Sequence, residues 1–318
     1  MKAALLAAAL SLVPALGQAQ AWPSKPLHAI VPVGAGSSTD IVHRLVLQQL
    51  SVALGQPIVV ENRPGAGGTI GTAAVARAEP DGYTLLANGA AHTIAPALYK
   101  ALPYDAARDF VPVVPIGSSP SVLVVSPASG FHSARALVAA AKARPGRLTF
   151  SSVGIGTATH LSAERFASSA GIELVHVPFK GGADAMMEVI AGRVDFFFGP
   201  VALVLPQIGE GKLLGLAVNG ERRSAALPEV PTLEQAGYRD AEYPIWFGLF
   251  APARTPRAIV EKLNRETLAA LQTPALRKKL TSLGVDAMVM DVDQFKAYVD
   301  KQFALNAALA AKAGLMAQ

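Results

Sequence analysis

Two short glycine-rich segments of this chain share one pattern. Residues 34–40 (Gly-Ala-Gly-Ser-Ser-Thr-Asp) follow the apolar run 27–33, and residues 154–160 (Gly-Ile-Gly-Thr-Ala-Thr-His) follow residues 148–150. Each segment predicts a loop that leaves a β-strand and opens an α-helix. Unpaired backbone N–H groups and the positive end of the helix dipole attract anions to a helix N-terminus. Two such loops, about one domain apart, predict a two-lobed solute-binding protein that holds a small carboxylate in a cleft.

Strands and helices are predicted to alternate along the chain. Strands are expected at residues 27–33, 57–61, 83–87, 122–125, 148–151, 173–177, 195–198, 213–218 and 246–251. Helices are expected at residues 40–54, 71–78, 133–143, 159–168, 184–191, 258–271, 274–283 and 292–313. This order favours an α/β fold with parallel sheets covered by helices.

The domain organisation follows from the ends of the chain and from this repeat. Residues 1–21 combine Lys2, a short apolar run and the small-x-small site Ala19-Gln20-Ala21, which predicts a signal peptide cleaved near Ala21, although a buried N-terminal helix is an alternative. The rest is long enough for two domains. We expect lobe 1 to comprise residues 22–117 and 238–318, and lobe 2 residues 118–237. The chain then crosses between the lobes twice, near 112–122 and 218–240, which favours hinged closure.

Composition excludes several classes of function. The chain has no cysteine, so disulfides, thiolate nucleophiles and cysteine metal sites are absent. Its net charge of +5 suits an anionic ligand, but basic residues interleaved with aromatics are missing, which argues against nucleic acid. The six histidines lack metal-ligand spacing, and no Gly-x-Ser-x-Gly motif occurs. We therefore expect no metal, no cofactor and no enzymatic activity.

The glycine-rich loops have two alternative interpretations. Gly34-x-Gly36-x-x-Thr39 approaches the dinucleotide-binding fingerprint, and Glu61 ends the next predicted strand, where a ribose-binding acid would lie. However, the third glycine of the fingerprint is Thr39 here and Thr159 in the second segment, and an exported protein meets little NAD. The loops could also be tight turns without a ligand, although their Ser and Thr hydroxyls exceed what a turn needs.

Three side chains near these loops are candidates for either a structural or a ligand-binding role. Asp40 can cap the first helix, and it can also contact a ligand amine or organise water. His160, at the mouth of the second loop, is a candidate ligand-site residue. Arg63 can bind an anion or pair with Glu61, and we favour the ion pair. Both residues belong to the glycine-rich block 61–68, whose glycines permit positive φ.

Several longer motifs resemble the Bug-type receptors, the periplasmic solute-binding proteins of tripartite tricarboxylate transporters. The matching segments are Val31-Pro32, Thr39-Asp40-Ile41-Val42, Arg44, Glu61-Asn62-Arg63-Pro64-Gly65-Ala66-Gly67-Gly68, Pro80-Asp81-Gly82-Tyr83-Thr84-Leu85, Leu102-Pro103-Tyr104-Asp105, Asp109-Phe110, His160-Leu161, Val177-Pro178-Phe179-Lys180-Gly181, Pro228-Glu229-Val230-Pro231-Thr232-Leu233-Glu234, Ala236-Gly237 and Ala251-Pro252. They cover essentially the whole chain after residue 21, in order.

The resemblance implies a two-lobed periplasmic binding protein, a type II-like "Venus flytrap" with two interlobe crossings. It implies a small carboxylate ligand (a di- or tricarboxylate, an acidic amino acid or an aromatic acid), a membrane permease or a sensor protein as partner, and a monomer in the periplasm. The ligand would be held by backbone N–H groups of residues 36–39 and 154–157. The expected ligand-binding residues are Gly34, Ala35, Gly36, Ser37, Ser38, Thr39, Asp40, Ser152, Gly154, Gly156, Thr157, His160 and Phe179.

This chain departs from the family pattern at two places. Ala35-Gly36-Ser37 stands where the family usually has Pro-Gly-Gly, so a side chain and a hydroxyl enter the first loop. Phe179 replaces a tyrosine, which removes a phenolic hydrogen-bonding group. We expect this second change to favour a ligand with an apolar or aromatic body.

Overall fold

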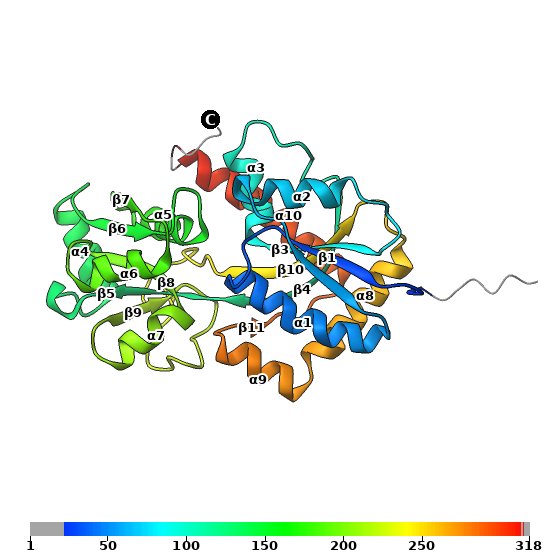
Figure 1. The fold of residues 1–318 in the computed structure, drawn as a ribbon. Helices are drawn as coiled ribbons and strands as arrows, with labels where there is room; N and C mark the ends of the chain where they lie inside the picture. The colour runs from blue at the N-terminus through cyan, green and yellow to red at the C-terminus, as the bar shows by residue number, and fades with distance from the viewer. Residues whose placement is uncertain (1–21, 313, 315–318) are drawn as a thin grey trace, which may run out of the picture.

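The strands of the computed structural model form two separate sheets, one in each lobe (Figure 1). The structure describes residues 22–312 and 314, so the predicted signal peptide lies outside the described residues. The sheet of the first lobe has the order β11-β4-β10-β3-β1-β2, with bounds β1 (Leu27–Val31), β2 (Ile58–Asn62), β3 (Thr84–Gly89), β4 (Phe110–Ser119), β10 (Ile245–Pro252) and β11 (Asp286–Ala287). The sheet of the second lobe has the order β7-β6-β8-β5-β9, with bounds β5 (Ser121–Val125), β6 (Thr149–Ser152), β7 (Val175–Pro178), β8 (Phe196–Pro200) and β9 (Leu214–Val218).

Helices cover both faces of the first sheet because its strands carry apolar side chains alternately on each face. Leu85 belongs to the core with α1 (Ser38–Leu54), α8 (Arg257–Leu271) and α9 (Pro274–Ser282), whereas Leu86 faces α2 (Thr69–Ala76), α3 (Ala90–Leu98) and α10 (Val292–Lys312). The helices of the second lobe are α4 (Ala134–Ala143), α5 (Ala158–Ala170), α6 (Gly182–Ile190) and α7 (Val201–Gly209). Two short 3₁₀ helices, η1 (Ala66–Gly68) and η2 (Pro127–Ser129), complete the described elements.

The same connectivity occurs in both lobes. In the first lobe β1 lies between β2 and β3, and in the second lobe β6 lies between β7 and β8. The chain therefore moves from the central strand to one side and then returns to the other side, with helices α1 and α2, or α5 and α6, in between. Such a reversal of strand order opens a crevice at the carboxyl ends of the strands, where α/β proteins bind ligands. Both glycine-rich loops lie at such a reversal.

The prediction of parallel sheets was wrong in part, because both sheets are mixed. Strand β10 is antiparallel to β3 and β4, and β5 is antiparallel to β8 and β9. Residues 112–122 were expected to be a crossing, but most of them belong to strand β4, which contains Pro112 and Pro115. A proline cannot donate to a ladder. The structure accommodates both prolines beside irregularities in the β4–β10 register.

Two short helices also escaped prediction. Helix α3 contains Pro96 and α7 contains Pro206, and a proline inside a run of this length argues against a helix. Each proline removes one intrahelical hydrogen bond, and both helices end within three residues of it.

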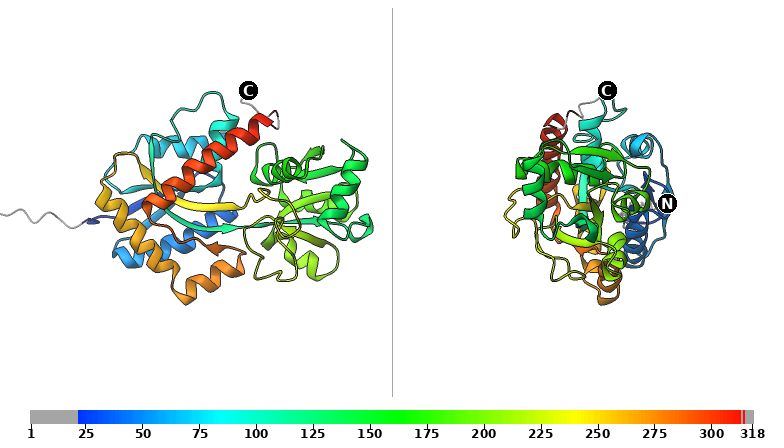
Figure 2. Two further views of the ribbon diagram at one scale, coloured as in Figure 1. Left: turned by 180° about the vertical axis from the view of Figure 1, so that it is seen from behind. Right: turned by 90° about the vertical axis from the view of Figure 1, so that its left-hand side faces the viewer.

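The chain crosses between the lobes at two adjacent points. Pro120 alone separates β4 from β5, and residues 219–244 connect β9 to β10. The crossings are bonded to each other, because the Ser121 N–H donates to Asn219 Oδ1 at 2.6 Å and the Asn219 N–H donates to the Ser121 carbonyl at 2.9 Å. The C-terminal segment is not a third domain, since β10 lies inside the first sheet and α10 packs on it (Figure 2). We keep the boundaries at 117/118 and 237/238 as a proposal.

Candidate ligand-binding site

A cavity of about 380 Å³ lies between the two glycine-rich loops. Its lining residues are Val33, Ser38, Thr39, Gly67, Asn88, Gly89, Ala90, Ala91, Ile94, Ala95, Leu98, Tyr99, Val153, Ile155, Gly156, Thr157, Ala158, Ile245 and Trp246. Hollows of about 520 and 560 Å³ occur elsewhere, so size does not single this cavity out. It stands out because both loops border it and because no Asp, Glu, Lys or Arg is among these lining residues.

The first loop (residues 34–40) leaves two backbone donors at the start of α1. Ser37 is the N-cap, and its Oγ accepts from the Asp40 N–H at 3.3 Å. The Gly36 N–H donates to Asp40 Oδ2 at 2.9 Å. Within residues 22–312, no acceptor pairs with the N–H of Ser38 or Thr39. These two groups border the cavity and are free for a ligand.

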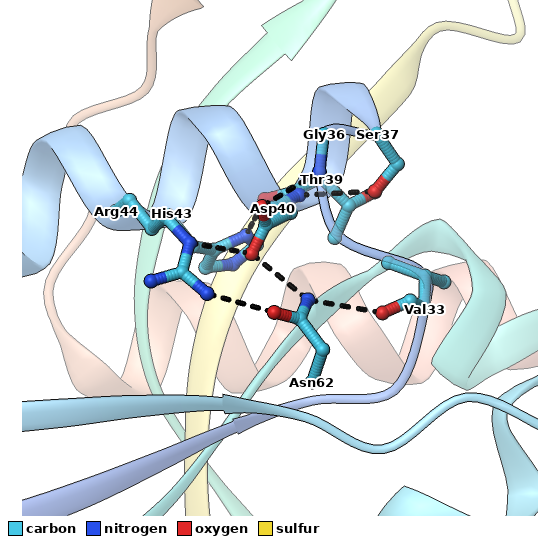
Figure 3. A network of polar contacts seen from close by, with 8 residues as sticks. All are labelled: Val33, Gly36, Ser37, Thr39, Asp40, His43, Arg44 and Asn62. Atoms are coloured by element: carbon cyan, nitrogen blue, oxygen red, sulfur yellow. Dashed lines mark hydrogen bonds and ion pairs between the residues drawn. The ribbon is translucent and has the colours of Figure 1, made fainter.

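The carboxylate of Asp40 accepts hydrogen bonds from other residues of the protein (Figure 3). It is only 3% exposed, and its Oδ1 accepts from Arg44 Nε at 2.8 Å and from Asn62 Nδ2 at 2.9 Å. Asn62 also donates to the Val33 carbonyl at 3.0 Å. Burial alone raises the pKa of Asp40, but the bonds from Gly36, Asn62 and Arg44 outweigh it and hold the pKa below its ordinary value. Asp40 therefore stays charged and fixes the loop.

The second loop (residues 154–160) repeats this device with a neutral ring. The Gly156 N–H donates to His160 Nδ1 at 2.9 Å, in the position where Gly36 donates to Asp40. Thr157 is the N-cap of α5, and its hydroxyl donates to the Gly154 carbonyl at 2.7 Å. In the part of the chain that the structure describes, the N–H groups of Ala158 and Thr159 have no acceptor.

Stacked rings support the second loop from behind. The rings of His160 and His176 are parallel with centroids 3.8 Å apart, and Phe150 stacks on His176 at 4.9 Å. Because Nδ1 of His160 accepts a hydrogen bond, we assign the ring proton to Nε2, which lies 3.5 Å from Glu164. Burial, followed by the neighbouring His160, lowers the pKa of His176 to about 4. His176 is therefore neutral near pH 7.

Ser152 also lies behind the second loop and not in the cavity. Its buried hydroxyl lies 2.6 Å from His176 Nε2 and accepts from the Gly154 N–H at 3.0 Å.

The structure divides the predicted site residues into three groups. Ser38, Thr39, Gly156 and Thr157 border the cavity. Gly34, Ala35, Gly36, Ser37, Asp40, Gly154, Ser152 and His160 form or support the loops without being among its lining residues. Phe179 packs in the apolar cluster of the second lobe with Val153 and Val177.

The expected set of backbone donors changes accordingly. The N–H groups of Gly36, Gly154, Gly156 and Thr157 donate within the loops, although they were predicted to hold a ligand. Of the predicted set, Ser38, Thr39 and Ile155 keep N–H groups without an acceptor in the described part of the chain, and Ala158 and Thr159 at the start of α5 add two more.

Sequence reasoning missed a third helix that begins at the cavity. Helix α3 starts at Ala90 directly after β3, and Asn88, Gly89, Ala90 and Ala91 all border the cavity. A polar residue and a glycine at the end of a predicted strand were the signal that could have revealed it.

The glycine-rich block 61–68 contains the predicted ion pair and the predicted glycines with positive φ. Arg63 Nε lies 2.5 Å from Glu61 Oε1, which confirms the ion pair. Gly65, Gly67 and Gly68 have positive φ, and Gly67 borders the cavity.

No cluster of His, Cys, Asp or Glu suited to a metal ion occurs among residues 22–312. None of the described helices is long and apolar enough to cross a membrane.

Comparison with known sequences identifies relatives over most of the chain. The sequence pattern of the "Tripartite tricarboxylate transporter family receptor" matches residues 42–315. Protein BugT of Bordetella pertussis is 36% identical over 283 residues, which cover 88% of this chain and 87% of BugT. The "UPF0065 protein in tcbD-tcbE intergenic region" of Pseudomonas sp. (strain P51) is 40% identical over 266 residues, which cover 83% of this chain and 79% of the relative.

Solved structures agree with these relatives. The periplasmic binding protein BugD is 33% identical with a TM-score of 0.75, covering 93% of this chain and 100% of BugD. Rpa4515 of R. palustris, solved with adipate, is 30% identical with a TM-score of 0.79, covering 93% of this chain and 100% of Rpa4515. MatC of Rhodopseudomonas palustris, solved with malate, is 29% identical with a TM-score of 0.74, covering 91% of this chain and 99% of MatC.

Proposed function

The chain belongs to the family of tripartite tricarboxylate transporter receptors, which are periplasmic solute-binding proteins, and we propose that it captures a small carboxylate in the cavity between α1 and α5. The observation that carries this proposal is the pair of helix N-termini that border one cavity. Ser38 and Thr39 present unpaired N–H groups from the first lobe, and Ala158 presents one from the second. A carboxylate placed there would accept from both lobes.

The chemistry of the lining supports an anion held by dipoles. Each hydrogen bond to a charged group contributes about 1.5–3 kcal/mol. Because none of the described residues that line the cavity is a lysine or arginine, the N–H groups and the two helix dipoles would balance the ligand charge. A ligand that touches both lobes also favours the closed form, since only differential affinity shifts such an equilibrium.

The class of acid and the partner are the finer part of the proposal. The apolar lining suits a di- or tricarboxylate, acidic amino acid or aromatic acid with an apolar body, and two relatives were solved with adipate and malate. We propose that the exported protein delivers this ligand in the periplasm to the permease of a tripartite tricarboxylate-type transporter. Presentation of the ligand to a sensor protein is the alternative.

A thermal-shift screen of about one hundred carboxylic acids tests this proposal. A ligand at 100 times its dissociation constant adds about 2.7 kcal/mol of stability, which is easily measured. The hits should remain chemically unchanged after incubation, as expected of a receptor and not of an enzyme. If the best ligand has no anionic group, or if it is turned over, the proposal fails.

A matched pair of variants locates the ligand. Thr39→Val removes a hydroxyl at the cavity and should weaken binding about 10-fold. Ser133→Ala removes the N-cap of α4, whose Oγ accepts from Ala136, and should lower stability without changing affinity. Equal affinities for both variants and the unmodified protein would place the ligand elsewhere.

A further inference from the structure

We propose that Tyr243 of the second crossing is a positioning residue, which holds the start of α5 in the second lobe against the start of α3 in the first. Both helices border the cavity at their first residues, Ala158 and Ala90. A fixed separation of these two helices sets the width of the cavity before any ligand binds. This role of Tyr243 rests on the proposed function, in which the cavity holds the ligand.

One face of α5 is bonded to the second crossing. Three of its side chains donate to backbone carbonyl groups of the crossing, Ser162 to Tyr243 at 3.2 Å, Arg165 to Glu242 at 2.9 Å and Ser169 to Arg239 at 2.6 Å. Their spacing of three and four residues puts these donors on the same side of the helix. Asn219 Nδ2 adds two bonds at one end of this contact, to the Tyr243 carbonyl at 2.8 Å and to the Ser162 hydroxyl at 3.0 Å. The backbone around Tyr243 therefore moves with α5.

The side chain of Tyr243 connects this crossing to the first lobe. It is 3% exposed, and its hydroxyl donates to Oδ1 of the buried Asn306 in α10. Asn306 Nδ2 donates to the Thr93 hydroxyl at 2.9 Å, and that hydroxyl donates at 3.0 Å to the carbonyl of Ala90, the first residue of α3. Burial raises the pKa of Tyr243 above its ordinary value, so the hydroxyl keeps its proton and remains a donor. Tyr243, Asn306, Thr93 and Ala90 thus form one chain of hydrogen bonds, the interlobe chain.

Apolar packing supports the same connection. Leu161 belongs to α5 of the second lobe, yet it is 1% exposed within an apolar cluster of the first lobe that includes Tyr243, Ile94 of α3 and Leu309 of α10. Separating α5 from α3 would expose Leu161 to water and would break the bond from Tyr243 to Asn306. Both costs favour a fixed separation of the two helices.

The interlobe chain acts on binding through the two helices. Tyr243, Asn306 and Thr93 are not among the residues that line the cavity, so they do not contact a ligand there. The apparent dissociation constant of a ligand equals its intrinsic constant divided by the fraction of molecules in the binding-competent arrangement. A link that fixes the separation of α3 and α5 raises this fraction. The loss of one neutral hydrogen bond changes the ratio of two such arrangements about 2- to 10-fold.

The distance between the lobes, measured without ligand, tests this role. The chain has no cysteine, so Val52→Cys in α1 and Met187→Cys in α6, both at exposed positions, place one spin label in each lobe for pulsed electron paramagnetic resonance. In this labelled protein, Tyr243→Phe should raise the ratio of longer to shorter distances about 2- to 10-fold. Tyr238→Phe is the matched control, because it removes a hydroxyl from the same crossing but outside the interlobe chain. Unchanged distances in Tyr243→Phe would overturn the proposal even if this variant were less stable, since a purely structural role changes stability alone.

A second variant tests the interlobe chain as a unit. Thr93→Val replaces the hydroxyl by a methyl group and cuts the chain between Asn306 and Ala90, so it should shift the distances in the same direction, and it decides the question if Tyr243→Phe folds poorly. Both substitutions together should shift the distances no further than either alone, because they cut one chain. Additive shifts would overturn it. An acid screen without a hit would overturn the proposed function and the binding role of the chain, while the distances still decide whether Tyr243 links the lobes.

Discussion

The first and second loops achieve the same backbone geometry with different chemistry. In each loop a glycine with positive φ, 79° at Gly36 and 73° at Gly156, donates its N–H to a side chain in the first turn of the following helix. That side chain is the carboxylate of Asp40 in one loop and the ring of His160 in the other. The shared requirement is an acceptor that fixes the glycine N–H, and its charge can vary.

The difference in charge has an electrostatic consequence. Asp40 is ionised and interacts favourably with the dipole of α1, so it offsets part of the positive potential that a ligand would meet there. Arg44 pairs with Asp40 and restores part of it. No anionic side chain accepts from the second loop's glycine, although Glu164 lies 3.5 Å from His160. We therefore expect the N-terminus of α5 to contribute more to anion binding than that of α1.

The largest effect is expected when the side chains that accept from the loop glycines, Asp40 and His160, are removed one at a time. Asp40→Ala leaves Gly36, Asn62 and Arg44 without their shared partner, so it should lower the free energy of unfolding by about 2–4 kcal/mol. His160→Ala removes one hydrogen bond and a stacked ring, so about 1–2 kcal/mol is expected. Urea unfolding of both variants measures the difference. If His160→Ala lowered the free energy of unfolding more than Asp40→Ala, our expectation that Asp40 stabilises the fold more than His160 would be wrong.

A second test places a methyl group on each equivalent glycine. Gly36→Ala and Gly156→Ala both strain a left-handed backbone, at a cost of about 1–2 kcal/mol each. A Cβ at position 36 meets no atom within 4 Å, whereas one at position 156 overlaps the side chain of Leu98 in the first lobe. Only Gly156→Ala should also weaken carboxylate binding, about 10-fold, because the loop must move away from α3. Calorimetry should show partial recovery when Leu98→Ala is added, and no recovery would refute the role of that contact.

The two loops should also respond differently to acid. His176 has a pKa of about 4 in the folded protein against an ordinary 6.5, so the unfolded state binds more protons between these values. Stability should therefore fall by about 1–2 kcal/mol as the pH drops from 6.5 to 4, after allowance for the partial exposure of the ring. Asp40, whose pKa is lowered, keeps its contribution above the ordinary carboxyl range and loses it only at lower pH.

Unfolding midpoints between pH 7 and 4 separate these effects. Burial also lowers the pKa of His92 in the first lobe to about 4 and lowers that of His43, so the unmodified protein carries all three contributions. His176→Asn should flatten the pH dependence in part, and His132→Asn, at an exposed position, should leave it unchanged. An unaltered slope in the His176 variant would contradict the assignment.

The smallest effect is expected beside the first loop. Arg63→Ala breaks the exposed pair with Glu61, and exposed pairs contribute little to stability, so neither unfolding nor binding should change measurably. Asn62→Ala, one residue away, removes the donor to Asp40 and Val33. This variant should lower both the free energy of unfolding and the affinity for the carboxylate. If the Arg63 variant alone lost carboxylate affinity, the anion-contact reading of Arg63 would be correct.

Local patterns predicted much of the fold and the position of both loops. In each loop the glycines, the Ser or Thr N-cap and the first apolar residues of the helix lie within about ten residues of one another. The loop geometry therefore follows from neighbouring residues in the sequence. The network behind each loop depends on strand pairing instead. Asn62 reaches Asp40 because β2 lies beside β1, and His176 stacks on Phe150 because β7 lies beside β6. Nothing in the spacing of these residues encodes that adjacency.

The cavity itself depends on contacts that are still longer in range. Helix α3 was hidden by Pro96, and its role follows only once β3 is known to lie next to β1. Likewise, the family motif predicts Phe179 as a ligand residue, but the motif does not describe the apolar cluster of the second lobe against which its ring packs.

The bond between the two crossings constrains how the lobes can move. A single flexible connection would let one lobe turn about any axis relative to the other. Here the crossings lie side by side at both ends, because Ser119 pairs with Ile245 in the first sheet and Ser121 exchanges two hydrogen bonds with Asn219 in the second lobe, so sliding one crossing past the other would break these bonds. Bending about the line through both crossings leaves these bonds intact. It changes the separation of the α1 and α5 N-termini while each sheet moves as a rigid body.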